Sequence, residues 1–154
     1  EYEPPVGLNP FERVCWWLTG IVGPIADQYE VPQDLEGAIM LQESGGQPWV
    51  QSPMNYSGGI PIGRAQGLMQ VMPWHFGVSL LPSGELSEAD RAYCQYPPRN
   101  LAKSAEILHR NYLFFGTWEM AVSAYFGFGV DATGASTSQY LASGMALRKL
   151  FQGG

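Results

Sequence analysis

Glycine and proline divide this chain into short segments, and most segments carry apolar residues at helical spacing. The 154 residues include 19 glycines and 12 prolines, which tend to end helices and begin loops. Apolar spacing and helix-start signals predict helices over residues 10–22, 32–43, 67–73, 87–95, 100–115, 118–125 and 138–151. No segment alternates apolar and polar residues as a strand does. The sequence therefore predicts a mainly α fold with long ordered loops.

The length of the chain corresponds to one ordinary domain. A domain of this size buries roughly 70% of the surface of its unfolded chain, which is enough for a core. Residues 1–10 are rich in proline and are predicted to form an extended N-terminal arm. Residues 11–154 are predicted to form a single folded domain, and we expect a monomer.

The chain is acidic, with a net charge of −6 at pH 7. Nucleic acids and anionic membranes attract lysine- and arginine-rich proteins, so neither is an expected partner. The apolar stretch near the start, residues 14–26, is too short and too interrupted by glycine and proline to cross a membrane. We therefore expect no nucleic-acid partner and no membrane span.

The cysteines and histidines are few. Cys15 and Cys94 could form a disulfide in an extracytoplasmic compartment, or remain two buried thiols, and their spacing does not decide between these. His75 and His109 are the only histidines, and they show no metal-ligand spacing with the cysteines. We expect no metal and no cofactor.

A lone carboxylate, Glu43, ends the predicted helix 32–43. Gly45 and Gly46 follow it and favour a left-handed helix stop. The negative end of the helix dipole and apolar neighbours favour the protonated form of such a glutamate, as a general acid requires. An exposed glutamate at a fraying helix end is the alternative. The next acidic residue is Glu85, so the 41 residues between them carry no second carboxylate.

The loop after Glu43 combines neutral hydrogen-bonding groups with flat aromatic rings. The hydrogen-bonding residues are Ser52, Asn55, Tyr56, Ser57, Gln66 and Gln70, and the aromatic residues are Trp49, Tyr56 and Trp74. Sugars require both kinds of surface, because they offer hydroxyl groups and apolar ring faces. Polar residues also fill ordinary long loops, so this composition alone does not identify a sugar site.

Three segments together match a known family pattern. They are LQESGGQPWVQS, AQGLMQVMP and NLAKSAEILHRNYLFFGTWEMAVSAYFGFG, and they cover roughly residues 31–129. The residues of the first two segments that fit the pattern are Glu43, Ser44, Pro48, Ser52, Ala65, Gly67, Leu68, Met69, Gln70, Met72 and Pro73. The segments occur in the family's order. On these residues the chain resembles the lytic transglycosylase (SLT-type) and goose-type lysozyme superfamily.

The resemblance implies a mainly α, lysozyme-like domain with a cleft that binds peptidoglycan glycan strands or chitin oligomers. It implies that Glu43 is the catalytic acid and base. The residues expected to contact substrate or shape the cleft are Trp49, Ser52, Met69, Gln70, Tyr125 and Tyr140. Such a protein would act outside the cytoplasm, as a secreted, periplasmic or phage virion-associated enzyme.

The chain departs from the family pattern at two places. The loop 53–64 is longer than expected and could add a substrate subsite or cover the cleft. Phe126 stands where the family has an asparagine that follows the tyrosine. A hydrogen bond to substrate is therefore lost or supplied elsewhere.

A lone carboxylate favours an intramolecular reaction over the two-carboxylate route of most glycosidases. Glu43 would first protonate the glycosidic oxygen and then remove the proton of the sugar's 6-hydroxyl, leaving a 1,6-anhydro end. An alternative is a goose-type hydrolytic muramidase or a chitin-cleaving relative, with Glu85, Glu88 or Asp90 as the base. A further alternative is a non-catalytic wall-binding or phage tail module.

Overall fold

The computed structural model describes residues 2–126 and 137–152, with the side chains of 137–141 outside the description. The helical elements are α1 (Pro10–Trp17), a π-helical turn (Leu18–Val22), α2 (Gly23–Gln28), α3 (Gln33–Glu43), α4 (Glu88–Gln95), α5 (Pro97–Phe115), α6 (Trp118–Phe126) and α7 (Thr137–Arg148), with 3₁₀ turns at Pro73–Phe76 and Lys149–Phe151. The strands are β1 (Asn55–Ser57) and β2 (Ile60–Gly63). The prediction of a mainly α fold is confirmed.

The helix ends follow the start and stop signals of the sequence. Asn9 caps α1 through a reciprocal pair of hydrogen bonds with Glu12, at 2.8 and 2.9 Å. The Ser87 hydroxyl accepts a hydrogen bond from the Asp90 amide at the start of α4. Gly116, with φ +85°, ends α5 in the left-handed conformation. α5 begins at Pro97 and not at residue 100, because proline is well tolerated in a first helical turn.

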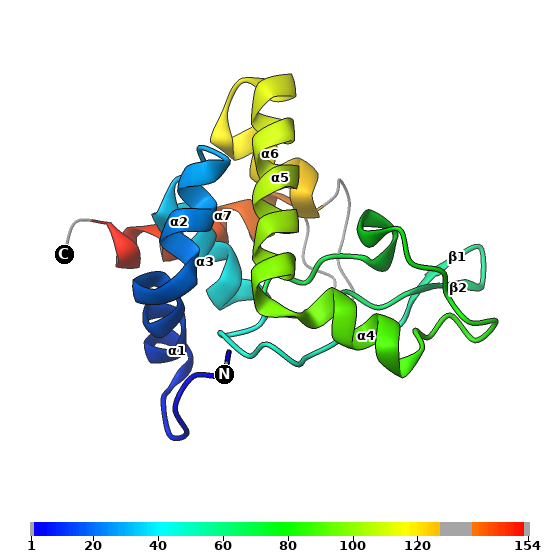
Figure 1. The fold of residues 1–154 in the computed structure, drawn as a ribbon. Coiled ribbons are helices and arrows are strands. Elements are labelled where there is room, and N and C mark those ends of the chain that lie inside the picture. Colours follow the sequence, from blue (N-terminus) through cyan, green and yellow to red (C-terminus); the bar gives the residue numbers. More distant parts are fainter. Residues whose placement is uncertain (1, 127–136, 153–154) are drawn as a thin grey trace.

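Helix α3 lies at the centre of the helical part and contacts α1, α2 and α7 (Figure 1). Its residues 35–40 are buried. α5 packs against α2 and α6, and its Leu101, Ala105 and Leu108 are fully buried in the core. α3 therefore carries Glu43 on a helix that is held on several sides.

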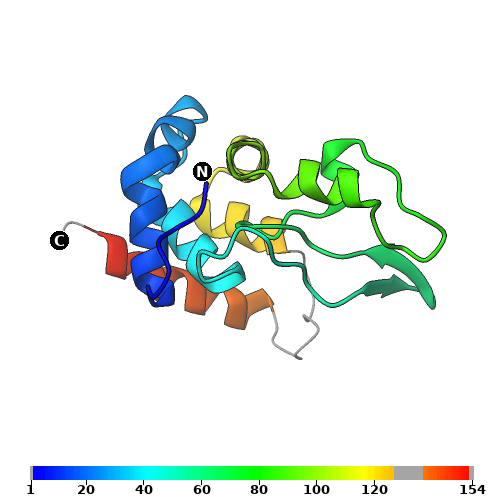
Figure 2. The same ribbon diagram turned by 60° about the horizontal axis from the view of Figure 1, so that its bottom comes forward.

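The loop 53–64 contains a β-hairpin that the sequence analysis did not predict. β1 and β2 pair antiparallel, and Gly58 and Gly59 form the turn with positive φ angles of 57° and 80°. Two consecutive residues with positive φ suit the tight turn of a two-residue hairpin. The strands were missed because they are short and β2 contains Pro61. Figure 2 shows the hairpin and α4 on the opposite side of the molecule from α1 and α2.

The segment 67–73 was predicted as a short helix and this is wrong. Residues 67–70 form a turn, and a 3₁₀ turn begins only at Pro73. Gln66 and Val71 pair with each other through two backbone hydrogen bonds of 2.9 and 3.1 Å, which close the turn. This turn lies beside the end of α3 and forms part of the pocket described below.

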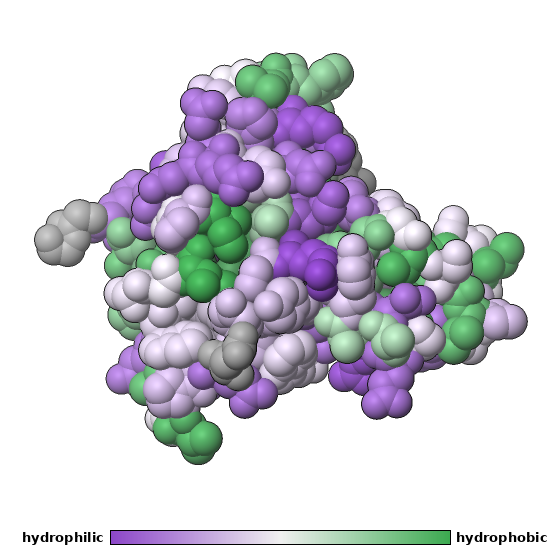
Figure 3. All heavy atoms as spheres, in the orientation of Figure 1, coloured by the Kyte–Doolittle hydropathy of each residue, from purple (hydrophilic) through white to green (hydrophobic). Residues whose placement is uncertain are grey.

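The N-terminal arm packs against the start of α5, and the two cysteines remain unpaired. The Tyr2 ring packs edge-on against Tyr96, with 5.5 Å between ring centroids. Cys15 and Cys94 are free thiols, so the disulfide alternative does not hold in this structure. At the C-terminal end of α5, Leu113 and Phe114 are exposed, and Figure 3 shows apolar side chains at the top of the molecule, where α5 ends in Figure 1.

No helix in the described part of the chain is long and apolar enough to cross a membrane.

Candidate active site

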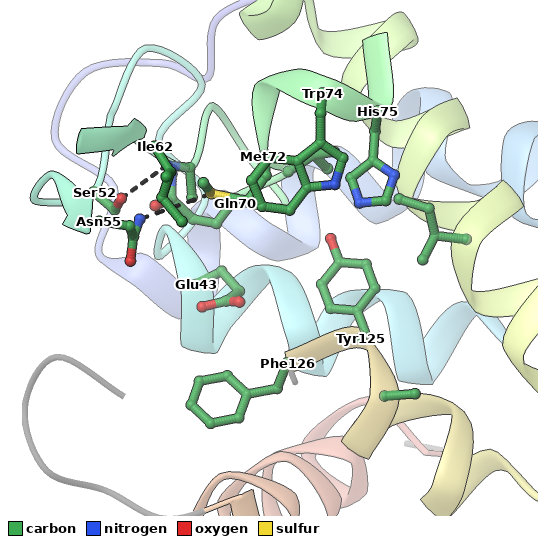
Figure 4. Close-up of a pocket in the computed structure, with 14 residues that line it drawn as sticks. Glu43, Ser52, Asn55, Ile62, Gln70, Met72, Trp74, His75, Tyr125 and Phe126 are labelled. Atoms are coloured by element: carbon green, nitrogen blue, oxygen red, sulfur yellow. Dashed lines mark hydrogen bonds between the residues drawn. The ribbon is translucent and has the colours of Figure 1, made fainter. Parts of the chain in front are cut away.

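A pocket of about 500 Å³ lies where the end of α3 meets the hairpin, the turn 66–71 and helices α5 and α6. The residues that line it are Glu43, Ser52, Asn55, Ile62, Ala65, Gln70, Val71, Met72, Trp74, His75, Ile107, Ala124, Tyr125 and Phe126. Figure 4 shows the Glu43 carboxylate facing the pocket, with Asn55 on the hairpin side and Tyr125 and Phe126 on the α6 side. Glu43 is the only carboxylate among these described lining residues.

The turn after α3 explains how Glu43 reaches this position. Gly45 and Gly46 have positive φ angles of 62° and 82°, as predicted for a helix stop. A Cβ on Gly46 would lie 2.7 Å from the Arg13 Cβ, so only glycine allows this approach to α1. The Gly46 carbonyl also accepts a 2.9 Å hydrogen bond from the Trp17 indole. The chain is therefore turned sharply under α1, and α3 ends with Glu43 facing the pocket.

Tyr125 lies beside Glu43 in the pocket lining. Its hydroxyl donates a 2.6 Å hydrogen bond to the Met69 carbonyl. Burial, and then the nearby charges of Glu43 and Glu36, raise the pKa of Tyr125 well above its ordinary value. Tyr125 is therefore a neutral group at physiological pH, and it connects α6 to the turn 66–71.

Gln70 lines the pocket from a strained backbone position. Its φ is +51°, a left-handed conformation that is unfavourable for residues other than glycine. The side-chain amide nitrogen donates to the carbonyls of Gly67 at 3.0 Å and Val50 at 3.3 Å. Strain of this kind persists only where the surroundings hold it in place.

Buried amide side chains hold the strained turn. Asn100 on α5 is fully buried, accepts the Met69 amide at 2.9 Å, and donates to the Gln66 carbonyl at 2.8 Å. The Gln66 side chain in turn accepts a 2.9 Å hydrogen bond from Gln95 on α4. This network fixes the backbone that carries Gln70, so the shape of the pocket depends on α4 and α5 as well as on the turn.

Ser52 lines the pocket and also closes the base of the hairpin. Its hydroxyl accepts a 2.8 Å hydrogen bond from the Ala65 amide and donates a 2.8 Å hydrogen bond to the Pro53 carbonyl. Because the hydroxyl proton is engaged, the remaining capacity of the oxygen is that of an acceptor. A sugar hydroxyl donating to Ser52 would fit this arrangement.

Three of the predicted substrate residues are not seen in the pocket lining. Met69 is fully buried, and its carbonyl accepts the hydrogen bond from the Tyr125 hydroxyl. Trp49 is partly exposed, and its indole donates a 2.9 Å hydrogen bond to Glu3 of the N-terminal arm. Tyr140 lies in α7, but its side chain falls outside the described residues.

The structure adds residues that the sequence analysis gave no role in the site. Asn55 and Trp74 belonged to the polar and aromatic set of the loop and Met72 to the family pattern, whereas Ile62 and His75 carried no signal. Burial lowers the pKa of His75, and the positive charges of Arg110 and Lys103 lower it further, so the ring is neutral at physiological pH. Phe126, which replaces the family asparagine, also lines the pocket.

The rival carboxylates lie elsewhere. Glu85 forms an ion pair with Arg64 at 2.9 Å, and this contact lowers the pKa of Glu85. Glu88 and Asp90 lie in the first turn of α4. None of the three lines the pocket. In the described part of the chain, no three His, Cys, Asp or Glu side chains gather as metal ligands would.

Comparisons with known proteins agree with the sequence resemblance. A solved structure, a complex of the 70-kDa soluble lytic transglycosylase with bulgecin A, is similar at 23% identity and a TM-score of 0.46, over 80% of this chain and 19% of that chain. The chain thus spans about a fifth of the length of that protein. No curated protein matches this chain. A sequence model of the transglycosylase SLT domain matches residues 21–138, which is more than half of the chain and includes Glu43. The predicted lysozyme-like fold is therefore confirmed, and the chain belongs to the transglycosylase SLT domain family.

Proposed function

We propose that this protein cleaves peptidoglycan glycan strands at the β-1,4 bond between N-acetylmuramic acid and N-acetylglucosamine, and leaves a 1,6-anhydro end. The observation that carries the proposal is the single carboxylate, Glu43, among the described residues that line the pocket. Most glycosidases place two carboxyl groups on either side of the scissile bond. A site with one carboxylate favours a reaction in which the same group gives and takes the proton.

In the proposed reaction Glu43 donates its proton to the glycosidic oxygen as the bond to the anomeric carbon breaks. The developing positive charge on that carbon is stabilised by the substrate's own acetamido group. The Glu43 carboxylate then accepts the proton of the 6-hydroxyl, whose oxygen bonds to the anomeric carbon. The proton count balances without water, and Glu43 returns to its protonated form.

The other lining residues would bind and orient the sugars. Trp74 is 57% exposed and offers a flat face on which a sugar ring can stack. Ser52 and Gln70 would hydrogen-bond the sugar near the cleaved bond. Tyr125, through its hydrogen bond to the Met69 carbonyl, would hold the turn 66–71 in place relative to Glu43. Met69 would act through its carbonyl, and Tyr140 would contribute from α7. Trp49 would contact the glycan only outside the pocket.

The test is the mass of the products. Digestion of purified peptidoglycan should release muropeptides one water lighter than hydrolysis products. Glu43→Gln should reduce the rate by about 10²–10⁴-fold, because general acid–base catalysis is removed. Glu88→Gln, at an exposed position outside the pocket lining, is the matched control and should retain activity.

The same digestion separates the alternatives. Fully hydrated reducing ends, together with loss of activity on replacing Glu85, Glu88 or Asp90, would identify a hydrolytic muramidase or chitin-cleaving relative. Unchanged turnover in Glu43→Gln, or none in the parent, would identify a wall-binding or phage tail module. We place the activity outside the cytoplasm because its proposed substrate is the cell wall.

A further inference from the structure

Asn55 brings the hairpin into the pocket. It is the first residue of β1 and lines the pocket together with Glu43. It belongs to the loop 53–64, the part of the chain that is longer than the family pattern predicts. The question is which group of a ligand this added residue could recognise.

The orientation of the Asn55 amide follows from its partners. The amide nitrogen donates to the Gly63 carbonyl at 3.1 Å and to the Met72 sulfur at 3.8 Å. A backbone carbonyl can only accept, so the nitrogen must face Gly63 and the oxygen must face away. In Figure 4 this oxygen points away from Met72 and toward the side on which Glu43 lies. Within the described residues the oxygen accepts no hydrogen bond.

A β-bulge produces this arrangement. Ser57 pairs with Ile60 and Tyr56 with Pro61, but Asn55 pairs with Gly63, so Ile62 is an extra residue on β2. Bulges of this kind redirect side chains next to functional sites. Here the bulge sets the Gly63 carbonyl opposite Asn55, and it also leaves Ile62 in the pocket lining.

The hairpin is anchored well enough to present Asn55 in one position. A Cβ on Gly84 would lie 2.6 Å from the Pro61 Cβ, which shows how closely the loop before α4 supports β2. Arg64, directly after β2, bonds both oxygens of Glu85 at 2.9 and 3.0 Å. A fixed acceptor loses less entropy on binding than a mobile one.

We infer that Asn55 recognises the acetamido group of an amino sugar in the cleft. An acetamido group has one N–H donor, which the Asn55 oxygen can accept, and one methyl, which the apolar side chains of Ile62 and Met72 can cover. The inference rests on the proposed function, since both sugars of peptidoglycan carry this group. It assigns part of the substrate specificity to a loop that lies outside the family pattern.

The test uses binding in a Glu43→Gln background, which keeps the ligand intact. Chitotetraose carries an acetamido group on each sugar, and cellotetraose has a hydroxyl in its place. Asn55→Leu should weaken chitotetraose binding by about 5–10-fold, which lies within the range for one neutral hydrogen bond, and leave cellotetraose binding unchanged. Tyr56 is an exposed neighbour of Asn55 on the hairpin, and Tyr56→Ala should change the binding of neither oligosaccharide.

Asn55→Asp separates recognition from anchoring. Aspartate keeps an oxygen toward the pocket but loses the N–H that bonds Gly63, so chitotetraose should bind within about 3-fold of the parent. Equal losses in Asn55→Asp and Asn55→Leu, or equal losses for both oligosaccharides, would overturn the inference in favour of a structural role. If the parent cleaves glycan strands and Asn55→Leu binds chitotetraose normally, the inference alone fails. If the parent neither cleaves nor binds any glycan, the proposed function fails with it.

Discussion

Glu36 carries a buried carboxyl group and lies on α3, the same helix that presents Glu43 to the pocket. Its side chain is 1% exposed, and one oxygen has no hydrogen-bond partner in the described structure. Burial raises the pKa of Glu36 from 4.5 to about 8, although a 3.4 Å hydrogen bond from Ser104 lowers it slightly. Glu36 is therefore protonated in the folded protein at neutral pH.

This residue makes stability depend on pH with a definite sign. Between pH 4.5 and about 8 the folded state keeps the Glu36 proton and the unfolded state loses it. The stabilising contribution is thus complete below pH 4.5 and is lost as pH rises through this window. We expect Glu36→Gln to remove this dependence, which amounts to at most ~1.4 kcal/mol per pH unit.

Urea unfolding of parent and variant from pH 4 to 9 measures this effect. The difference between the two curves of unfolding free energy against pH isolates the contribution of Glu36, because the titration of His75 affects both curves equally. Glu30→Gln, at an exposed position, should give a curve parallel to the parent. A parallel curve for Glu36→Gln as well would contradict the assignment.

The sequence pattern predicted several residues that the structure brings together in the pocket lining. The pocket brings together Glu43, Ser52, Gln70 and Tyr125, all expected from the sequence. Met69 stands in the same motif but is buried, because part of the motif shapes the turn and not the binding surface. A linear pattern does not distinguish these two functions.

At the scale of elements, the turn 66–71 depends on one close approach between Gly67 and α5. Gly67 has φ +77°, and a Cβ there would lie 2.8 Å from the Asn100 amide nitrogen. Gly67→Ala should therefore lower the free energy of unfolding by about 1–3 kcal/mol and reduce activity, because Gln70 moves with the turn.

Gly116→Ala is the matched control for this prediction. Gly116 also has a positive φ, +85°, but a Cβ there meets no atom within 4 Å. Denaturant unfolding of Gly116→Ala should thus show a smaller decrease in the free energy of unfolding than Gly67→Ala, because only backbone strain contributes. Its activity should stay near that of the parent. Equal losses of stability and activity in both variants would exclude the contact with Asn100 as the cause.

Helices such as α3 and α5 were predictable because apolar residues recur along them at helical spacing and a glycine follows the last turn. Helix α2 (Gly23–Gln28) was not predicted, because the expected helix ended at residue 22, before Pro24. The hairpin was not predicted either, since its strands span three and four residues and give too few positions to establish an alternation. Its Gly58-Gly59 turn was the available signal. Trp49 lies outside the pocket lining, and its hydrogen-bond partner, Glu3, is 46 residues away in the N-terminal arm, a contact that sequence spacing does not predict.

At the scale of the whole molecule, the net charge of −6 opposes approach to an anionic cell wall. Raising ionic strength from about 0.01 to 0.15 M shortens the Debye length from about 30 to 8 Å. We expect the initial rate on intact anionic walls to rise over this range. The rate on short uncharged oligosaccharides should stay constant, and a falling rate on walls would contradict the prediction.

The base of the hairpin has a consequence for how this family can diversify. The Ser52 amide donates to the Ala65 carbonyl at 3.0 Å, and the Ala65 amide donates to the Ser52 hydroxyl. Residues 53–64 therefore begin and end at one pair of hydrogen-bonded residues, Ser52 and Ala65. Doubling the length of a flexible loop costs only about 0.6 kcal/mol in closure entropy. We expect that other loops grafted between Ser52 and Ala65 can change sugar preference while Glu43 keeps its place.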